Sequence, residues 1–171
     1  MSILAIRLYP DPVLRSPARP VAELGPELAR LVADMIETMH AAPGIGLAAP
    51  QVGVARQVAV VDLSVGKDPS ALHVLVNPRV VERHGLATEV EGCLSLPGIS
   101  DKVDRPERIR LAALDGEGQP FELAAEGWLA RAICHEVDHL AGVLFIDHLR
   151  GLRRERARRQ LKRLVAEEVA V

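Results

Sequence analysis

The chain has 171 residues and a formal net charge of −2, and this length fits one domain with a substantial core. Hydrophobic residues make up 49% of the sequence and charged residues 26%, which is typical of a globular protein in water. The balanced charge argues against a general attraction to nucleic acid, and 2% aromatic residues leave too few rings for a base-stacking surface.

The sequence predicts a cytoplasmic protein without a membrane anchor. Its first residues, MSILAIRLYPDPVLR, contain no apolar stretch of signal-peptide length, and the longest apolar runs are far shorter than a membrane span. The two cysteines, Cys93 and Cys134, are too few for a disulfide scaffold. We therefore expect both thiols to be reduced.

The first third of the chain predicts one helix and one short strand. Residues 1–20 are rich in proline and favour an extended arm over the surface. A helix is expected from Pro26, because apolar residues recur three and four apart up to Met39, before a Pro-Gly pair ends it. The glycine-rich segment 42–54 predicts a loop, and residues 57–63, QVAVVDL, predict a strand.

The middle of the chain predicts antiparallel strands. Residues 72–78 and 79–85 are two strand candidates separated by an Asn-Pro pair, and residues 89–98 form an extended segment. Residues 108–115 and 120–125 flank the turn sequence DGEG, which is typical of a hairpin.

The last third predicts a central helix and a terminal helix. The first runs over residues 127–141 with Gly142 as its C-cap, residues 145–147 predict a short strand, and residues 149–169 predict the terminal helix. This order of elements is no regular alternation of strands and helices. It favours an α+β fold in a single domain over residues 1–171, with small antiparallel sheets around a central helix and a helix near each end.

The predicted central helix contains the sequence CHEVDHL, in which His135, Glu136 and His139 form the pattern H-E-x-x-H. Two histidines four residues apart lie on one face of a helix and can bind the same metal ion. A carboxylate beside the first histidine can take a proton from a metal-bound water. The pattern is short and arises by chance, so it needs a third ligand.

Several residues are candidates for that third ligand. The peptidase pattern with a third histidine fails, because Phe145 occupies its position, and Glu167 and Glu168 lie in a charged tail. A Cys93 thiolate would be a strong ligand, although a lone cysteine is more often a small buried hydrophobic residue. Cys134 lies about 100° around the helix from the first histidine and is expected to belong to the core.

Three segments together resemble the signature motifs of the peptide deformylases. They are GIGLAAPQVG (44–53), EGCLS (91–95) and HEVDH (135–139), and the family has G-x-G-x-[AS]-A-x-Q, E-G-C-x-S and H-E-x-D-H in this order. The resemblance covers essentially the whole chain. It implies a hydrolase that removes the formyl group from the N-terminal formyl-methionine of newly made bacterial polypeptides.

The resemblance also implies roles for individual residues. Cys93, His135 and His139 would bind one divalent ion, with water in the fourth position and Glu136 as the general acid and base. The family metal is typically Fe²⁺, with zinc, nickel and cobalt forms as alternatives. Because iron and sulfur both oxidise, we expect activity to decay in air.

Other residues are expected to contact the substrate. By the resemblance, the Gln51 amide and the Leu94 backbone N–H stabilise the oxyanion, and Gly46 contacts the substrate through its backbone. Further substrate contacts are expected from residues near the motifs, namely Ile45, Trp128, Ala132 and Arg105. For Arg105, an ordinary surface arginine is an equal alternative.

Two residues in or near the HEVDH motif have no catalytic assignment from the sequence. Arg131 occupies an otherwise apolar position of the family's methionine pocket, where its stem could still cover a methionine side chain. For Asp138, a structural ion pair with an arginine is favoured over a role in orienting a ligand.

The predicted terminal helix is strongly basic, with seven arginines and one lysine against one glutamate over residues 150–163. It is either a solvated surface helix docked by four leucines or a contact to ribosomal RNA, as in some deformylases. The docking leucines would be Leu149, Leu152, Leu161 and Leu164. The expected partners are thus the nascent formylated polypeptide and the ribosome, and the chain itself is expected to be a monomer.

Two rival functions remain open from the sequence, and the complete catalytic set argues against a third, a deformylase-like protein that has lost its activity. A metallopeptidase would cut unformylated peptides, whereas a deformylase releases formate and leaves the peptide intact. A ribosome-binding module without catalysis would bind ribosomes with strong salt dependence and would not need Glu136.

Overall fold

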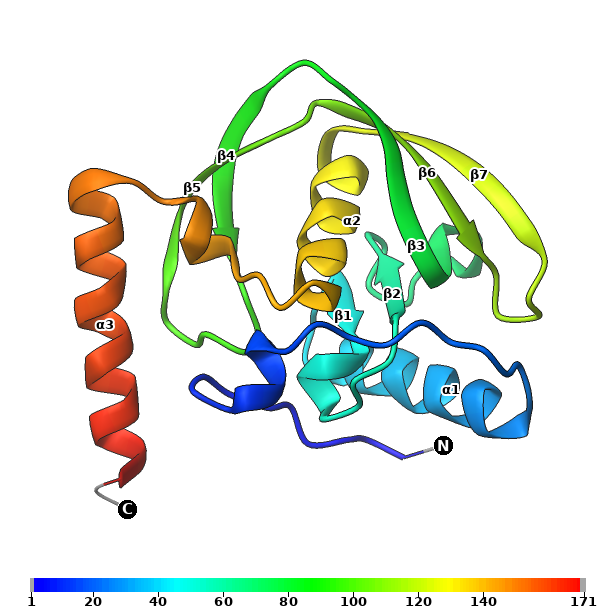
Figure 1. The fold of residues 1–171 in the computed structure, drawn as a ribbon, viewed down its shortest axis with the longest axis horizontal. Coiled ribbons are helices and arrows are strands. Elements are labelled where there is room, and N and C mark those ends of the chain that lie inside the picture. Colours follow the sequence, from blue (N-terminus) through cyan, green and yellow to red (C-terminus); the bar gives the residue numbers. More distant parts are fainter. Residues whose placement is uncertain (1, 170–171) are drawn as a thin grey trace.

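The computed structural model describes residues 2–169, whose helices and strands surround one central helix. The α-helices in this part of the chain are α1 (Pro26–Ala41), α2 (Gly127–Leu140) and α3 (Gly151–Val169). Figure 1 shows α2 in the middle of the molecule, with α3 at its periphery. None of the helices formed by residues 2–169 is long and apolar enough to cross a membrane.

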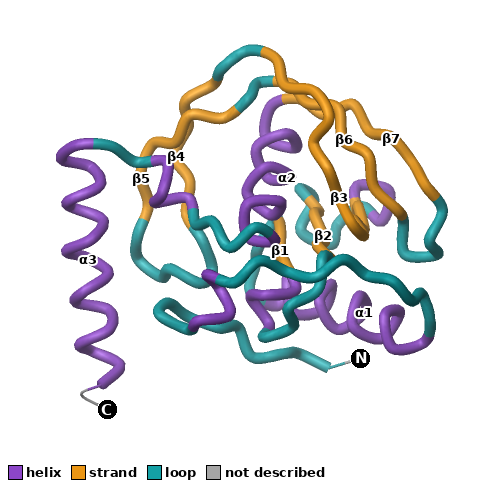
Figure 2. Tube along the Cα trace, viewed as in Figure 1, coloured by secondary structure: helices purple, strands orange, loops and turns teal. Residues whose placement is uncertain are grey.

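Two antiparallel sheets lie on different sides of α2, as the coloured tube in Figure 2 shows. The larger sheet has the strand order β1-β2-β3-β6-β7. Its strands are β1 (Gly46–Ala48), β2 (Val58–Asp62), β3 (Leu72–His84), β6 (Arg108–Leu114) and β7 (Pro120–Glu126). The smaller sheet pairs β4 (Ala87–Gly92) with β5 (Ser100–Arg105). The expected α+β fold is confirmed.

The hydrophobic core has three parts that fix these elements. Between α2 and the larger sheet, Ile133 packs with Leu111 and other fully buried residues. Under α1, Met35 packs against apolar residues of β1 and β2. The third part joins the N-terminal arm through Leu14 to β5 and to α3 through Leu161. The central helix is therefore held by packing, which leaves a separate polar face for chemistry.

Most predicted elements occur within one or two residues of their expected limits. The helix α1 begins at Pro26, because the missing N–H of proline is tolerated in a first turn. The strands β6 and β7 form the predicted hairpin. After α2, Gly142 has a φ of 74°, and a Cβ there would lie 2.6 Å from the Arg15 carbonyl oxygen. Only glycine fits this close approach of two backbones.

The loop expected over residues 42–54 is partly wrong. Residues 46–48 form β1, which pairs with β2 in the register Gly46 to Val61, and residues 49–52 form a 3₁₀ turn. A strand of three residues is too short to produce a detectable alternation of polar and apolar positions.

Two further predictions about strands are wrong. The two candidates around the Asn-Pro pair are one strand, β3, with a shifted register there. Asn77 takes a φ of 50° and exchanges two hydrogen bonds with the Val21 backbone, which stabilises this bulge. Residues 145–148 form a 3₁₀ helix and no strand, because the Asp147 carboxylate caps the Leu144 N–H at 2.9 Å.

The terminal helix docks with fewer leucines than expected. Leu149 and Leu161 are buried and Leu164 is partly buried, but Leu152 is 81% exposed. Leu152 lies in the first turn of α3, before Ala157, the first residue of this helix that is buried.

Candidate active site

Three potential metal ligands converge where β4 ends beside α2. Cys93 directly follows β4, and its sulfur lies 3.2 Å from Nε2 of His139. Nε2 of His139 lies 3.2 Å from Nε2 of His135, one turn earlier on α2. The three donor atoms all lie within 4.8 Å of one another. The structure thus brings together the two histidines and the cysteine that the sequence suggested.

The orientation of His135 is fixed by Glu91, a residue for which the sequence reasoning assigned no role. Nδ1 of His135 lies 3.1 Å from the Glu91 carboxylate, so Nδ1–H donates, and in the neutral ring Nε2 has its lone pair toward the cluster. A carboxylate behind a histidine is the usual arrangement at metal sites, where it sets the tautomer. Glu91 stands two residues before Cys93, in the segment EGC.

The electrostatics of the cluster favour one positive charge among the three donors. Burial opposes the charged form of His135, but Cys93 and Glu91 outweigh it and raise the pKa of His135 to about 10. Burial and the neighbouring His135 hold the pKa of His139 well below its usual range. Two imidazole Nε2 atoms and a sulfur that lie 3.2 Å apart need a proton or a metal ion between them. The donor set therefore fits a cation, and thiolate with imidazole suits iron, zinc, nickel or cobalt.

Glu136 lies against the cluster in an environment that favours its neutral form. Burial raises the pKa of Glu136 to about 7, although the nearby His135 acts in the opposite direction. Its Oε2 is buried and has no hydrogen-bond partner among residues 2–169. A carboxyl group with a pKa near 7 and a free oxygen is suited to accept a proton and return it.

Gly46 makes room for this carboxyl group. A Cβ at position 46 would lie 2.3 Å from Oε1 of Glu136, which is closer than two such atoms can approach. The first glycine of the same segment, Gly44, faces Leu94 in a similar way, with a Cβ 2.9 Å from its Cδ1. Gly46 therefore has a steric reason to be glycine, because the Glu136 side chain is buried, whereas the end of the Leu94 side chain could move to admit a Cβ at position 44.

The Gln51 amide is oriented by the backbone of its own segment. Its Oε1 accepts the Ala48 N–H at 2.9 Å, so its NH₂ group is directed away from β1. This NH₂ group lies 3.2 Å from the Ser95 hydroxyl and 3.7 Å from the Cys93 sulfur. A neutral donor is thus held at the edge of the cluster.

A cavity of about 390 Å³ opens beside the cluster. It is lined by residues of three groups, the 43–46 segment with Gln51, the end of β4, and one face of α2. Of the expected substrate contacts, Ile45, Gly46, Trp128 and Ala132 lie in this lining, as do Leu94 and Arg131. The surface of this lining is mainly apolar, and Trp128 within it is half exposed.

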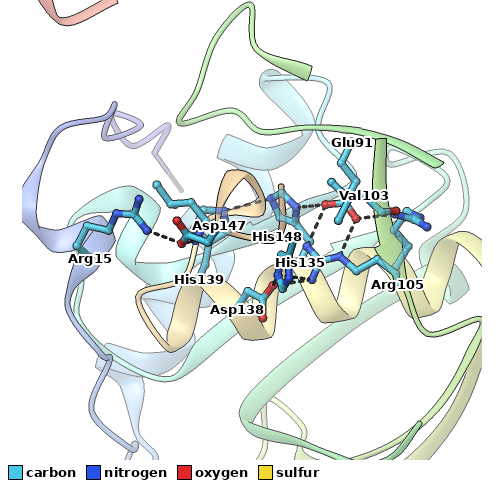
Figure 3. Close-up of polar contacts among 11 residues, drawn as sticks. Arg15, Glu91, Val103, Arg105, His135, Asp138, His139, Asp147 and His148 are labelled. Atoms are coloured by element: carbon cyan, nitrogen blue, oxygen red, sulfur yellow. Dashed lines mark hydrogen bonds and ion pairs between the residues drawn. The ribbon is translucent and has the colours of Figure 1, made fainter. Parts of the chain in front are cut away.

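Arg105, expected as a substrate contact, is not part of the cavity lining. The side chain is 3% exposed, and its guanidinium donates to Glu91 at 2.8 Å and to Asp138. Figure 3 shows this arrangement, with Asp138 also contacting His148. Asp138 forms the structural ion pair favoured from the sequence. Cys134 is a buried core residue whose pKa is raised by burial.

Comparisons with known proteins identify the family. The sequence model of polypeptide deformylase matches residues 3–155. A peptide deformylase of Alkalilimnicola ehrlichii is 53% identical over 165 residues, which cover 96% of this chain and 92% of that protein. The crystal structure of a peptide deformylase from Legionella pneumophila superposes with a TM-score of 0.90 at 43% identity, covering 98% of both chains.

A second crystal structure agrees, that of peptide deformylase from Thermus thermophilus. It has a TM-score of 0.88 at 44% identity, and the match covers 96% of this chain and 99% of that one. The chain therefore belongs to the polypeptide deformylase family, the metal-dependent hydrolases that remove the formyl group from N-terminal formyl-methionine.

Proposed function

We propose that Cys93, His135 and His139 hold one divalent metal ion in this deformylase, with Fe²⁺ as the native metal. The observation that carries the proposal is the convergence of one sulfur and two Nε2 atoms within 4.8 Å beside a buried carboxyl group. When bound, such an ion supplies Lewis acidity, which makes water a nucleophile near neutral pH and polarises a carbonyl oxygen. Zinc, nickel and cobalt also suit these donors.

Glu136 is the proton carrier in this proposal. Hydrolysis forms a bond between a water oxygen and the formyl carbon and breaks the bond between that carbon and the methionine nitrogen. Glu136 accepts the water proton as the first bond forms and gives it to the departing amine as the second breaks. Its pKa of about 7 lets one group serve both steps near neutral pH.

Gln51 and Leu94 stabilise the negative charge that develops on the formyl oxygen. The Gln51 NH₂ group is already aimed at the cluster, because its oxygen is engaged by Ala48. The Leu94 N–H directly follows the cysteine ligand in the chain. Losing one such pre-placed donor typically costs about 2.7–4 kcal/mol in activation free energy.

The cavity is proposed to take the first residue of the nascent polypeptide. Ile45, Trp128 and Ala132 supply apolar surface for the methionine side chain, and Gly46 offers its backbone to the peptide. Since this substrate arises at the ribosome, we place the protein in the cytoplasm, where it acts as a monomer.

The decisive experiment measures formate release from formyl-Met-Ala-Ser by anaerobically prepared, Fe²⁺-loaded protein. Unformylated Met-Ala-Ser, followed by mass spectrometry, is the control for peptidase activity. We expect rapid formate release, an uncut tripeptide, and loss of both activity and bound metal in a Cys93→Ala variant. Full metal occupancy in Cys93→Ala would overturn the ligand assignment. Cleavage of Met-Ala-Ser would instead establish a peptidase.

A second proposal concerns α3 as a contact to the ribosome. All seven arginines of residues 150–163 are exposed, whereas Ala157 and Leu161 hold the opposite face of the helix against the body. This arrangement offers a positive surface to the phosphates of RNA. Cosedimentation with ribosomes at increasing salt tests the proposal, and binding that is absent at low salt would contradict it.

A further inference from the structure

The three proposed metal ligands come from two parts of the molecule, a helix packed on the larger sheet and the end of a strand in the smaller sheet. His135 and His139 are on α2, which packs against the larger sheet through its apolar face. Cys93 follows β4, which pairs only with β5 among the described strands. Figure 1 shows β4 and β5 on the opposite side of α2 from β3, β6 and β7. The distance from the sulfur to the two imidazoles therefore depends on what holds the smaller sheet against α2.

Arg131 makes the most extensive polar connection between α2 and the smaller sheet. Its guanidinium donates to the Glu91 carboxylate at 2.8 Å, to the Val103 carbonyl at 2.8 Å and to the Ala87 carbonyl at 2.7 Å. These acceptors lie near the end of β4, on β5 and at the start of β4. One side chain that is 3% exposed thus spans both strands of the smaller sheet.

The same contacts lead directly to the ligands. Arg131 is four residues before His135, so both project from the same face of α2. Glu91, which accepts from Arg131 through Oε1, contacts His135 through Oε2 at 3.1 Å. In the chain, Glu91 is also two residues before Cys93. A displacement of Glu91 relative to Arg131 would consequently move a histidine and the cysteine together.

We infer that Arg131 is a positioning residue that fixes the Cys93 sulfur at binding distance from the two histidines. The inference rests on the proposed ligand set. Arginine suits this role because its planar fork donates in several fixed directions at once, whereas lysine offers a point charge on a flexible stem. Arg105 holds Glu91 from another direction and pairs with Asp138, as Figure 3 shows. Two buried arginines and two carboxylates therefore balance in charge around the site.

The alternative is that Arg131 serves the substrate, because its side chain also lines the cavity. An Arg131→Met variant separates the two roles, since methionine keeps an unbranched stem but removes every donor. The matched control is Arg110→Met, because Arg110 also bridges two carboxylates, Glu82 and Glu122, but on strands away from the site. Both variants are prepared without metal and titrated with Co²⁺, whose absorption reports a bound sulfur through a ligand-to-metal charge-transfer band.

We expect Arg131→Met to bind Co²⁺ about 10–100-fold more weakly, the range typical for partners of metal ligands, and to show a weaker charge-transfer band. Arg110→Met is expected to match the unchanged protein. Wild-type Co²⁺ affinity and absorption in Arg131→Met, together with a raised KM for formyl-Met-Ala-Ser, would overturn the inference in favour of the substrate role.

Two further variants keep the test decisive. Should Arg131→Met fail to fold by circular dichroism, Arg131→Lys takes its place, and wild-type Co²⁺ binding by the lysine variant would overturn the inference. Cys93→Ala distinguishes failure of the inference from failure of the proposed site. Loss of Co²⁺ binding in Cys93→Ala with normal binding in Arg131→Met rejects only the role of Arg131. Normal binding in both rejects the ligand set itself.

Discussion

The helices α2 and α3 are both rich in charged and polar groups but use them in opposite ways. On α2, Arg131, Glu136 and His139 are each less than 5% exposed and are surrounded by other polar groups. On α3, the arginines face solvent, and the contacts of Arg153 and Arg156 with Asp101 are at the surface. A charged side chain that is displaced from its partners on α2 therefore destabilises the protein. On α3 the number of charges matters more than their placement.

This contrast follows from the dielectric surroundings. A buried ionic group that loses its partner typically destabilises a protein by about 3–5 kcal/mol, whereas exposed ion pairs contribute about 0–1 kcal/mol. Chemistry that depends on the direction of single atoms thus belongs on α2. A contact that depends on summed charge can be made by α3.

The largest expected effect comes from removing the buried carboxylate of α2. We predict that Glu136→Ala lowers kcat for formate release by about 10²–10⁴-fold, the usual contribution of a general acid or base. The variant should still bind its metal, because Glu136 is not one of the three convergent donors. Glu155→Ala on α3, where the side chain is exposed, is the matched control and should keep full activity. A fully active Glu136→Ala would refute the proposed mechanism.

The next effect tests how closely the site is packed around that carboxylate. In Gly46→Ala the new Cβ would lie 2.3 Å from Oε1 of Glu136, so one of the two must move. A misplacement of about 1 Å can cost about 10²-fold in rate, and we expect a loss of this order in kcat/KM. Gly25→Ala is the control, because a Cβ there meets no atom within 4 Å. Equal kinetics of the two variants would show that the site is less rigid than proposed.

The sequence predicted the three donors that converge in this site but not the polar groups that surround them. Two histidines four apart must share a helix face, and the short motifs indicated the cysteine and Gln51 by resemblance. The burial of Arg105 and Arg131 was not predictable, because a sequence does not show which carboxylates an arginine will meet. Both meet Glu91, which is 14 and 40 residues away along the chain.

The same holds for the fold, in which features set by neighbouring residues were predicted and features set by contacts between distant residues were not. The first helix and the β6–β7 hairpin were predicted because their signals are local. The strand β5 was missed, since Ser100–Arg105 contains one buried valine among polar residues and is defined by its pairing with β4. The bulge at Asn77 depends on hydrogen bonds with Val21, a contact that only the folded chain creates.

Asp62 is a buried carboxylate outside the site, and its removal is expected to have a smaller effect, on stability. Burial raises the pKa of Asp62, but hydrogen bonds from Ser64, Gly66 and His40 outweigh it and lower the pKa to about 2. Because the pKa in the folded protein lies below the ordinary value of 3.8, the contribution is present above about pH 4 and is lost as the pH falls toward 2.

We therefore predict that Asp62→Asn loses at most about 2 kcal/mol of unfolding free energy at pH 7. The difference from the unchanged protein should shrink below pH 4, as measured by urea unfolding at several pH values. Glu117→Gln, an exposed carboxylate in the turn between β6 and β7, serves as the control. A difference that stays constant down to pH 2 would contradict the proposed ionic contribution of Asp62.

The smallest effect on catalysis is expected from α3. A triple variant with Arg154, Arg158 and Arg159 replaced by glutamate should keep kcat/KM for the tripeptide within about twofold, because exposed charges are screened over about 8 Å at physiological salt. The helix itself should remain docked, since Ala157 and Leu161 stay in place. Ribosome binding should weaken, and the slope of log affinity against log salt should fall by about one for each arginine that contacts a phosphate. An unchanged slope would show that α3 is a solvated surface helix. In that case α2 would carry the catalytic residues, and the charges of α3 would serve only solubility.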